Sequence, residues 1–301
     1  IVNNPTYTAP NGPSTGFSIQ SVDFKNVVET GKFGGEDAPI KMLWVYSANP
    51  VNTHTDTHAW TDTIIPAMDY VVVADSVMTD TAKYADMVLP IAQWFELEEV
   101  SNAGQTSSLN YNEKAIDPLY ESKPDPQIVS ELAQKLGLGD YFSLDNGGIL
   151  KEMMDTPIGA ALGQTVEDLR EKKQVRVVPG DAEKKPHIAY ENGAFGTATG
   201  RFEFYRENPL PRAATTKVPT AEEIEINRMA HWFPPLEAWP ENELYKKYPL
   251  VLMSERPRYR VHSQWFSTPL LRELDPEPSA KLHPDTAEAH GIAEGDYMRI
   301  Y

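Results

Sequence analysis

The feature that most constrains the fold of this chain is a run of consecutive apolar residues, Tyr70-Val71-Val72-Val73-Ala74, which ends at Asp75. A half-exposed strand alternates apolar and polar residues. This run is apolar at every position, which is typical of a parallel strand covered on both faces. It therefore predicts a parallel sheet inside an α/β domain.

The segments on either side of this run extend the same pattern. Residues 40–46 form a short apolar run that stops at Ser47-Ala48-Asn49-Pro50, and residues 87–92 form a third. Helices are expected over about 56–68 and 79–84, which makes the order strand, helix, strand, helix, strand. A further helix is expected over 126–136, where Pro stands near the start and Gly137 marks the stop. The fold class is α/β, with a Rossmann-like parallel sheet.

The rest of the chain is divided by composition. Residues 1–39 are an irregular lead-in with a helix near 21–30, 40–140 are the α/β domain, and 141–247 are a connector with helices near 148–154 and 166–173. A half-exposed strand is expected over 200–205, because apolar and polar residues alternate there. A second domain occupies 248–301, with strands at 249–253 and 297–301 and a helix over 284–290.

Composition excludes several classes of protein. The chain has 301 residues and a formal net charge of -17, so non-specific binding to nucleic acid is not expected. No apolar run is long enough for a membrane-spanning helix. Without cysteine, this chain holds neither a disulfide nor a thiolate-ligated iron–sulfur cluster. No targeting signal is visible, the compartment stays open, and the Ile-Val-Asn-Asn-Pro start is typical of an interior segment.

Two polar residues stand where the first two predicted strands end. Open α/β sheets bind ligands beyond the carboxyl ends of their strands, which places Asn49 and Asp75 at a ligand crevice. The Asp75 carboxylate could accept two neighbouring hydrogen bonds from a guanine edge, or bind a ribose diol. It could equally cap the next helix. Thr79 and Thr81 are either hydroxyl donors to a ligand or local caps.

Other clusters have weaker patterns. His54 and His58 have the spacing of a zinc pair but lack a third ligand, so we expect no metal at this pair. Glu96, Glu98 and Glu99 are expected to be solvated. A dense cationic and polar cluster follows the strand predicted at 249–253, and it either holds a pyrophosphate or pairs with Glu255, Glu273 and Asp275. Its members are Arg256, Arg258, Arg260, His262, Ser263 and Gln264.

Taken in order, several segments resemble the C-terminal part of the molybdopterin oxidoreductases of the dimethyl sulfoxide reductase family. Residues 43–50 resemble its strand and G-x-N-P turn, with Ser47 where Gly is usual. Residues 71–90 resemble its most specific signature, and 200–205 its G-[RK]-x-E-F-Y strand. Residues 249–264 and 283–296 resemble the start of its double-psi type β-barrel, which binds the dinucleotide.

The resemblance implies a cofactor, molybdopterin guanine dinucleotide in its bis form, with molybdenum or tungsten. Near its guanosine end it implies Asn49, Asp75 and Thr79, with Ser47 and Pro50 in the adjoining turn. Near the pyrophosphate or pterin it implies Arg258, His262, Ser263 and Gln264. The metal ligand and the iron–sulfur cluster domain would lie upstream of Ile1. Expected partners are an iron–sulfur electron-transfer subunit, together with the rest of the catalytic subunit.

The loop after the third strand departs from the common pattern. The family often carries E-G-T-x-x-N-x-E-G-R there, whereas residues 98–104 lack that Gly and the later Gly-Arg. Together with residues 121–125, this loop is more similar to the acetylene hydratase, catechol dehydroxylase and transhydroxylase branch. Two alternatives stay open: a non-catalytic scaffold relative in a respiratory complex, and a stand-alone nucleotide-binding α/β protein.

Overall fold

The computed structural model describes residues 19–101, 108–139, 146–154, 163–176, 188–207, 209, 220–235 and 238–300. Most of the predicted lead-in, residues 1–18, lies outside these ranges. The chain divides into two compact units, Ile1–Pro249 and Leu250–Tyr301. No helix in the described part of the chain is both long and apolar enough to cross a membrane.

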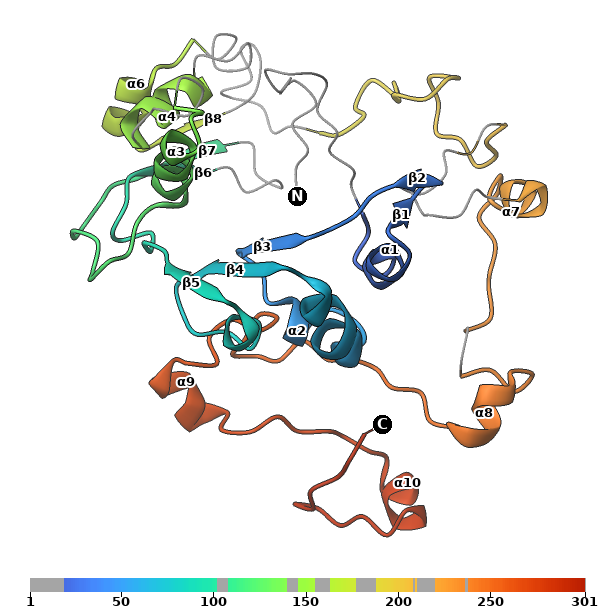
Figure 1. Cartoon of the computed structure of the whole chain (residues 1–301). Helices are drawn as coiled ribbons and strands as arrows, with labels where there is room; N and C mark the ends of the chain where they lie inside the picture. Colours follow the sequence, from blue (N-terminus) through green and yellow to red (C-terminus); the bar gives the residue numbers. More distant parts are fainter. Residues whose placement is uncertain are drawn as a thin grey trace. The chain divides into compact units, whose positions relative to one another are not determined.

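The first unit contains most of the regular structure (Figure 1). Its strands are β1 (Lys32–Phe33), β2 (Glu36–Asp37), β3 (Met42–Tyr46), β4 (Tyr70–Asp75), β5 (Met87–Pro90), β6 (Glu99–Ser101), β7 (Ser108–Asn112) and β8 (Gln174–Arg176). Its helices are α1 (Phe24–Thr30), α2 (Pro50–Thr53), η1 (Ala59–Ile64), η2 (Ile65–Ala67), η3 (Ala82–Tyr84), α3 (Asp125–Lys135), α4 (Asn146–Met154), α6 (Val166–Lys172), α7 (Ala221–Ile226) and α8 (Glu243–Lys247). The second unit has α9 (Pro269–Leu274) and α10 (Pro284–Ala289).

A parallel sheet of three strands, in the order β3-β4-β5, is the centre of the first unit (Figure 1). Tyr46 of β3 pairs with Ala74 of β4, and Asp75 pairs with Pro90 of β5. In β4, positions 71–74 are buried on both faces. The predicted parallel sheet and its doubly covered middle strand are confirmed.

One face of this sheet carries the main core. Val45, Val71 and Val73 pack there against Trp60 and Ile64 of η1. Phe24 of α1 stacks on Trp60 at a ring-centroid distance of 5.6 Å. These contacts remove large apolar side chains from water, which is the main source of stability for such a layer.

The connection over 56–68 is not the α-helix that the sequence predicts. It consists of a π-helix, η1, followed by a short 3-10 helix, η2, which contains Pro66. A proline inside a helix has no N–H to donate, and its ring clashes with the carbonyl four residues earlier, so the regular α-helical ladder fails there. The helical path still buries Trp60 and Ile64 against the sheet.

A second, smaller core lies where the sequence suggests a loop and a connector. Strands β6, β7 and β8 form an antiparallel sheet, which packs with α4 and α6. The buried members of this core are Leu150, Met154, Val166, Leu169 and Val175. The helices of this region match the predicted ones closely, but its strands were not predicted, because each is short and contains no run of apolar residues.

The expected strands of the C-terminal part are the main correction. Residues 250–300 contain no strand, and within 200–205 only Tyr205 makes an isolated bridge, to Met229. A strand needs a neighbour that accepts its backbone hydrogen bonds, and no other segment of 250–300 supplies one. Tyr301 lies outside the described residues. The start of a β-barrel in this unit remains a prediction.

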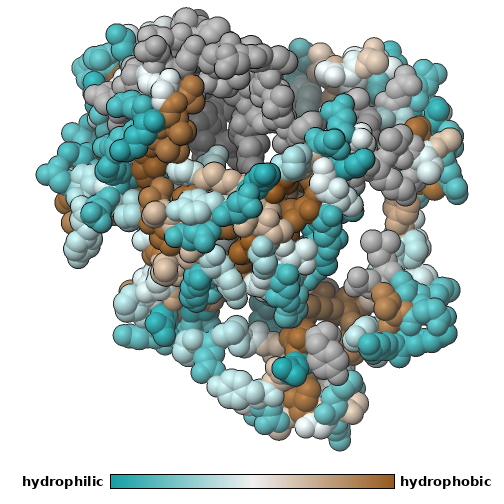
Figure 2. Space-filling view, in the orientation of Figure 1, coloured by the Kyte–Doolittle hydropathy of each residue, from teal (hydrophilic) through white to brown (hydrophobic). Residues whose placement is uncertain are grey.

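Apolar side chains of the second unit are correspondingly exposed. Its described residues include a single buried side chain, that of Arg260. Leu252 and Met253, expected inside a strand, are 75% and 83% exposed. Figure 2 shows that hydrophobic residues reach the molecular surface at several places between hydrophilic ones.

Candidate functional site

The carboxyl ends of β3 and β4 bring several predicted residues to one edge of the sheet. The strands are adjacent and parallel, so the turn at 47–50 and the segment that begins at Asp75 leave the sheet side by side. Ser47 adopts a left-handed backbone conformation, with φ of 51°. Pro50 is buried at the first position of α2, where its missing N–H costs no hydrogen bond.

The Asp75 carboxylate is oriented by its own turn. Its Oδ1 accepts hydrogen bonds from the backbone N–H of Ser76 at 2.7 Å and of Val77 at 3.4 Å. No donor among the described residues reaches Oδ2. One oxygen thus fixes the group while the other is left to accept a hydrogen bond from a ligand.

Asn49 faces the interior and joins the two segments. Its Oδ1 accepts hydrogen bonds from the backbone N–H of Thr81 at 3.1 Å and from the Thr81 hydroxyl at 2.8 Å. The same hydroxyl accepts the N–H of Val51 at 3.2 Å. Asn49 is 6% exposed and Thr81 fully buried. The role of Asn49 beside the guanosine end stays a prediction.

Thr79 acts as a local cap, one of the two roles expected for it. Its Oγ1 accepts the N–H of Ala82 at 3.1 Å, which starts the short helix η3. A hydroxyl that accepts one hydrogen bond still carries its own proton. Thr79 can therefore also donate a hydrogen bond to a ligand at this edge.

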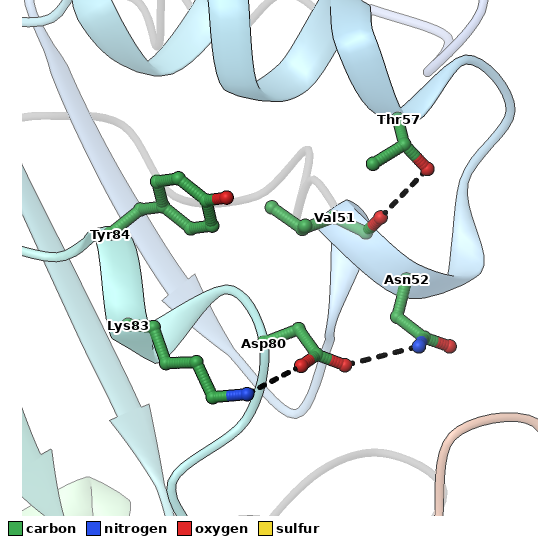
Figure 3. Close-up of a pocket in the computed structure, with 6 residues that line it drawn as sticks. All are labelled: Val51, Asn52, Thr57, Asp80, Lys83 and Tyr84. Carbon is green, nitrogen blue, oxygen red and sulfur yellow. Dashed lines mark hydrogen bonds and ion pairs between the residues drawn. The ribbon is translucent and has the colours of Figure 1, made fainter.

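A cavity of about 440 Å³ adjoins these segments (Figure 3). Asp80 lies between two donors: Lys83 Nζ is 2.8 Å from its Oδ1, and Asn52 Nδ2 is 3.1 Å from its Oδ2. Lys83 lowers the pKa of Asp80 most, and the amides of Asn52 and Asn49 lower it further. None of the residues predicted for the site lines this cavity, which is bounded by Val51, Asn52, Thr57, Asp80, Lys83 and Tyr84.

Asp125, which no sequence motif singles out, lies near Asp75 at this edge. It is the first residue of α3, and burial raises its pKa, with the negative charge of Asp75 adding to the effect. Two carboxylates are therefore close enough to repel each other. Their nearness could not be found from the sequence, since they belong to elements separated by β5, β6 and β7.

In the second unit, a tight turn presents His262 and Ser263. The backbone N–H of Gln264 donates to the carbonyl of Val261 at 2.9 Å. His262 has φ of 51°, in the left-handed region, which a turn of this kind requires at its second position. His262 and Gln264 are exposed, as is Arg258, whose guanidinium lies 5.7 Å from the ring centroid of Tyr259.

Arg260 anchors the same loop. Its guanidinium pairs with the Asp275 carboxylate at 3.1 Å, donates to the Asp275 carbonyl and lies 4.3 Å from the ring centroid of Phe266. The residue is 5% exposed. For Arg260, pairing with a nearby acid is thus the correct alternative of the two that the sequence left open.

The histidine pair shows no arrangement for a metal. His58 pairs with Asp62 at 3.3 Å, while His54 packs edge-on against Trp60. Among the residues that the structure describes, no group of three or more His, Cys, Asp or Glu could hold an ion. Glu98 is not a freely solvated acid, because it pairs with Arg170.

Two family models match the chain. One, described as molybdopterin oxidoreductase, matches residues 21–135, and the other, a molybdopterin dinucleotide binding domain, matches residues 250–301. The chain therefore contains a molybdopterin oxidoreductase domain and a molybdopterin dinucleotide binding domain. The first match contains the strand-end residues Ser47 to Thr79, and the second contains the turn with His262.

Relatives with known names agree with this assignment. A Halobacterium salinarum protein, named for the catalytic subunit of dimethyl sulfoxide reductase, is 29% identical over 97% of the chain and 33% of its own length. Trimethylamine-N-oxide reductase of Haemophilus influenzae is 29% identical over 87% of the chain and 32% of its own length. Dimethyl sulfoxide reductase DmsA of Escherichia coli is 27% identical over 88% and 34%. The chain thus spans about a third of these relatives.

A solved structure shares the fold. The acetylene hydratase of Pelobacter acetylenicus superposes with a TM-score of 0.69 and 23% identity, covering 91% of this chain and 35% of that one. The chain therefore has the fold of the corresponding third of that protein.

Proposed function

We propose that this chain is the part of a molybdenum- or tungsten-dependent oxidoreductase catalytic subunit that holds the guanosine and pyrophosphate of molybdopterin guanine dinucleotide, in its bis form. The family assignment and the names of the relatives support this role. When bound, the molybdopterin group supplies the dithiolene sulfurs that ligate the metal. The residues of this chain bind and orient that group.

The observation that carries the proposal is the Asp75 carboxylate at the end of β4. Its Oδ1 is held by the N–H groups of Ser76 and Val77, and no described residue donates to its Oδ2. Guanine offers an N–H and an amino group on one edge, and ribose offers two hydroxyls. A fixed carboxylate oxygen suits either group, and the Thr79 hydroxyl can add a donor.

Asp125 makes the fit to a donor-rich ligand better. Because Asp75 and its half-buried neighbour Asp125 repel each other, this edge of the sheet favours a ligand that brings hydrogen-bond donors to the carboxylates. A guanine edge has this chemistry, whereas a phosphate would add a third negative charge. We therefore assign the base or ribose, and not the pyrophosphate, to this edge of the sheet.

The second unit has the opposite chemistry. Arg258 brings a positive charge, and the turn at 261–264 brings the donors of His262, Ser263 and Gln264. Arginine and amide donors suit pyrophosphate oxygens and the polar edge of a pterin. The proposed assignment is the pyrophosphate or pterin, with Arg260 holding the loop in place through Asp275.

The remaining parts of the reaction are assigned to the rest of the polypeptide. This chain has no cysteine, so a thiolate-ligated iron–sulfur cluster would come from the part of the catalytic subunit outside it. We assign the protein ligand to the metal to that part as well. A further proposed partner is an iron–sulfur electron-transfer subunit. The substrate is not assigned.

The test is the guanine nucleotide content of Asp75→Asn in the complete catalytic subunit, purified from a host that makes the cofactor. Asparagine keeps the shape of the side chain but removes its charge and replaces one acceptor with a donor, which opposes the guanine edge. Acid hydrolysis releases GMP from the bound dinucleotide. We expect about one tenth of the wild-type GMP per polypeptide, since a lost charged hydrogen bond costs about 1.5 kcal/mol or more.

The matched control is Asp37→Asn, an exposed carboxylate in β2 of the same unit. It is expected to keep full GMP content. Wild-type protein that releases no GMP, or an Asp75→Asn variant with full content, would overturn the proposal.

A further inference from the structure

We propose that Asn49 and Thr81 form a positioning pair, which sets the segment from Asp75 to Thr79 in its ligand-binding conformation. The inference rests on the proposed function, because it assigns a role toward the same nucleotide. Neither residue needs to contact the ligand, since both act through the backbone that carries Asp75 and Thr79.

The pair joins the turn after β3 to the segment after β4 by hydrogen bonds in both directions. The Asn49 side-chain oxygen accepts hydrogen bonds from both the backbone N–H and the hydroxyl of Thr81, at 3.1 Å and 2.8 Å. The Thr81 hydroxyl in turn accepts a hydrogen bond from the backbone N–H of Val51 at 3.2 Å. This hydroxyl, from a residue that follows β4, therefore both donates to and accepts from the turn after β3.

Burial strengthens these hydrogen bonds. Thr81 has no exposed surface and Asn49 is 6% exposed, so water does not compete for these groups. Hydrogen bonds in such an environment are expensive to leave unmade. Neighbouring Asp80 adds to the connection between the two segments, because it accepts a hydrogen bond from Asn52 of α2 and pairs with Lys83 (Figure 3).

Hydrogen bonds restrain the backbone conformation of the residues between Asp75 and Thr81 at both ends. At one end, the Asp75 carboxylate closes a turn with Ser76 and Val77. In the middle, the N–H of Thr79 donates to the carbonyl of Val77 at 2.9 Å. At the other end, Thr81 is held by Asn49. This short segment is thereby held in one conformation before a ligand arrives, which lowers the cost of binding.

The decisive variant is Thr81→Val, which removes the hydroxyl and keeps the size of the side chain. It leaves the Val51 N–H and one acceptor site of Asn49 without their partner. Thr81→Ser keeps the hydroxyl and is the rescue variant. In the complete catalytic subunit, we expect GMP content to fall about fivefold or more in Thr81→Val and to stay at the wild-type level in Thr81→Ser.

A stability control separates positioning from a general loss of folding. Ile64→Val shortens a buried side chain in the main core on the parallel sheet, and Ile64→Ala shortens it further. The variant whose melting temperature matches that of Thr81→Val is expected to keep its GMP. Should Thr81→Val not fold, Thr81→Ala removes the hydroxyl together with the methyl group and adds no atom in their place, and the same comparison applies.

The outcomes distinguish the two proposals. If wild type contains GMP and Asp75→Asn loses it, full content in Thr81→Val overturns the positioning role alone. Equal losses in Thr81→Val and the matched Ile64 variant, or in Thr81→Val and Thr81→Ser, also overturn it. Wild type without GMP, or Asp75→Asn with full content, overturns the proposed function and this inference with it.

Discussion

At the scale of single residues, two turns of the candidate site contain a residue in the left-handed backbone conformation, which is unfavourable for residues with a Cβ atom. Ser47 and His262 both have φ of 51°, and each lies in a turn that carries predicted site residues. The left-handed conformation costs a residue with a Cβ atom about 1–2 kcal/mol. Glycine, which has no Cβ atom, adopts this conformation without strain.

We predict that Ser47→Gly stabilises the protein. The relief of left-handed strain exceeds the larger backbone entropy that glycine loses on folding, so the free energy of unfolding should rise by about 0.5–1 kcal/mol. Urea denaturation followed by tryptophan fluorescence measures this value. Ser21→Gly, outside the left-handed region, is the control and should not gain stability. A loss of stability in Ser47→Gly would contradict the prediction.

At the scale of elements, one polar cluster joins the second sheet to α6. Glu98, just before β6, accepts a hydrogen bond from Arg170 Nε of α6 at 2.5 Å and from the Tyr111 hydroxyl of β7 at 2.7 Å. The Arg170 guanidinium, and to a lesser degree Tyr111, hold the pKa of Glu98 below its ordinary value of 4.5. The glutamate side chain is 24% exposed.

This cluster predicts a loss of stability in acid. A lowered pKa in the folded state means that the ionised carboxylate stabilises the fold above its ordinary pKa, and that this contribution disappears as the pH falls through the lowered value. Below pH 4.5, Glu98→Gln should therefore flatten the decline in the free energy of unfolding. At pH 7 it should cost about 1 kcal/mol, because the pair is partly exposed.

Glu113→Gln is the control for this measurement. Glu113 pairs with Lys173 at 2.8 Å on the surface, with a side chain that is 70% exposed. Such pairs contribute little, so its pH profile should follow that of the wild type. Equal flattening in both variants would show that Glu98 has no special contribution.

At the scale of the whole molecule, the two units differ in how much apolar surface they bury. All of the fully buried apolar side chains among the described residues lie between Val27 and Val175, in the first unit. The second unit exposes Leu250, Val251, Leu252, Met253, Leu270, Tyr297 and Ile300. Burial of apolar area offsets the conformational entropy that a chain loses on folding, so the second unit is the less stable of the two.

This difference predicts the pattern of amide hydrogen exchange in the 301-residue chain. Peptides from 250–300 should exchange within minutes, while those covering β3, β4 and β5 should stay protected for hours, because backbone groups without a buried core open easily. Mass spectrometry of peptic fragments measures both. Equal protection of the two regions would contradict the prediction. In the complete catalytic subunit, we expect peptides from 250–300 to gain protection.

The amount that local sequence determined differs among these elements. The β-branched run at 71–73 predicted a parallel strand buried on both faces, and the sequence placed Asp75 at the carboxyl end of that strand, where the structure has it. Such patterns depend on neighbours within a few residues, so they can be recognised without a structure. The ordered motifs also predicted the family. In contrast, the expected helix over 56–68 became a π-helix, because Pro66 interrupts the ladder.

Only the tertiary structure decided which side chains meet. Thr81 bonds to Asn49, 32 residues away, and Arg170 bonds to Glu98, 72 residues away. The negative charge of Asp75 helps to raise the pKa of Asp125, although three strands separate the two residues in sequence. These contacts depend on how strands and helices pack, and no local pattern encodes that packing. Local periodicity thus determined the three strands of the parallel sheet and the edge where they end, whereas chain packing decided the partners that orient the candidate site.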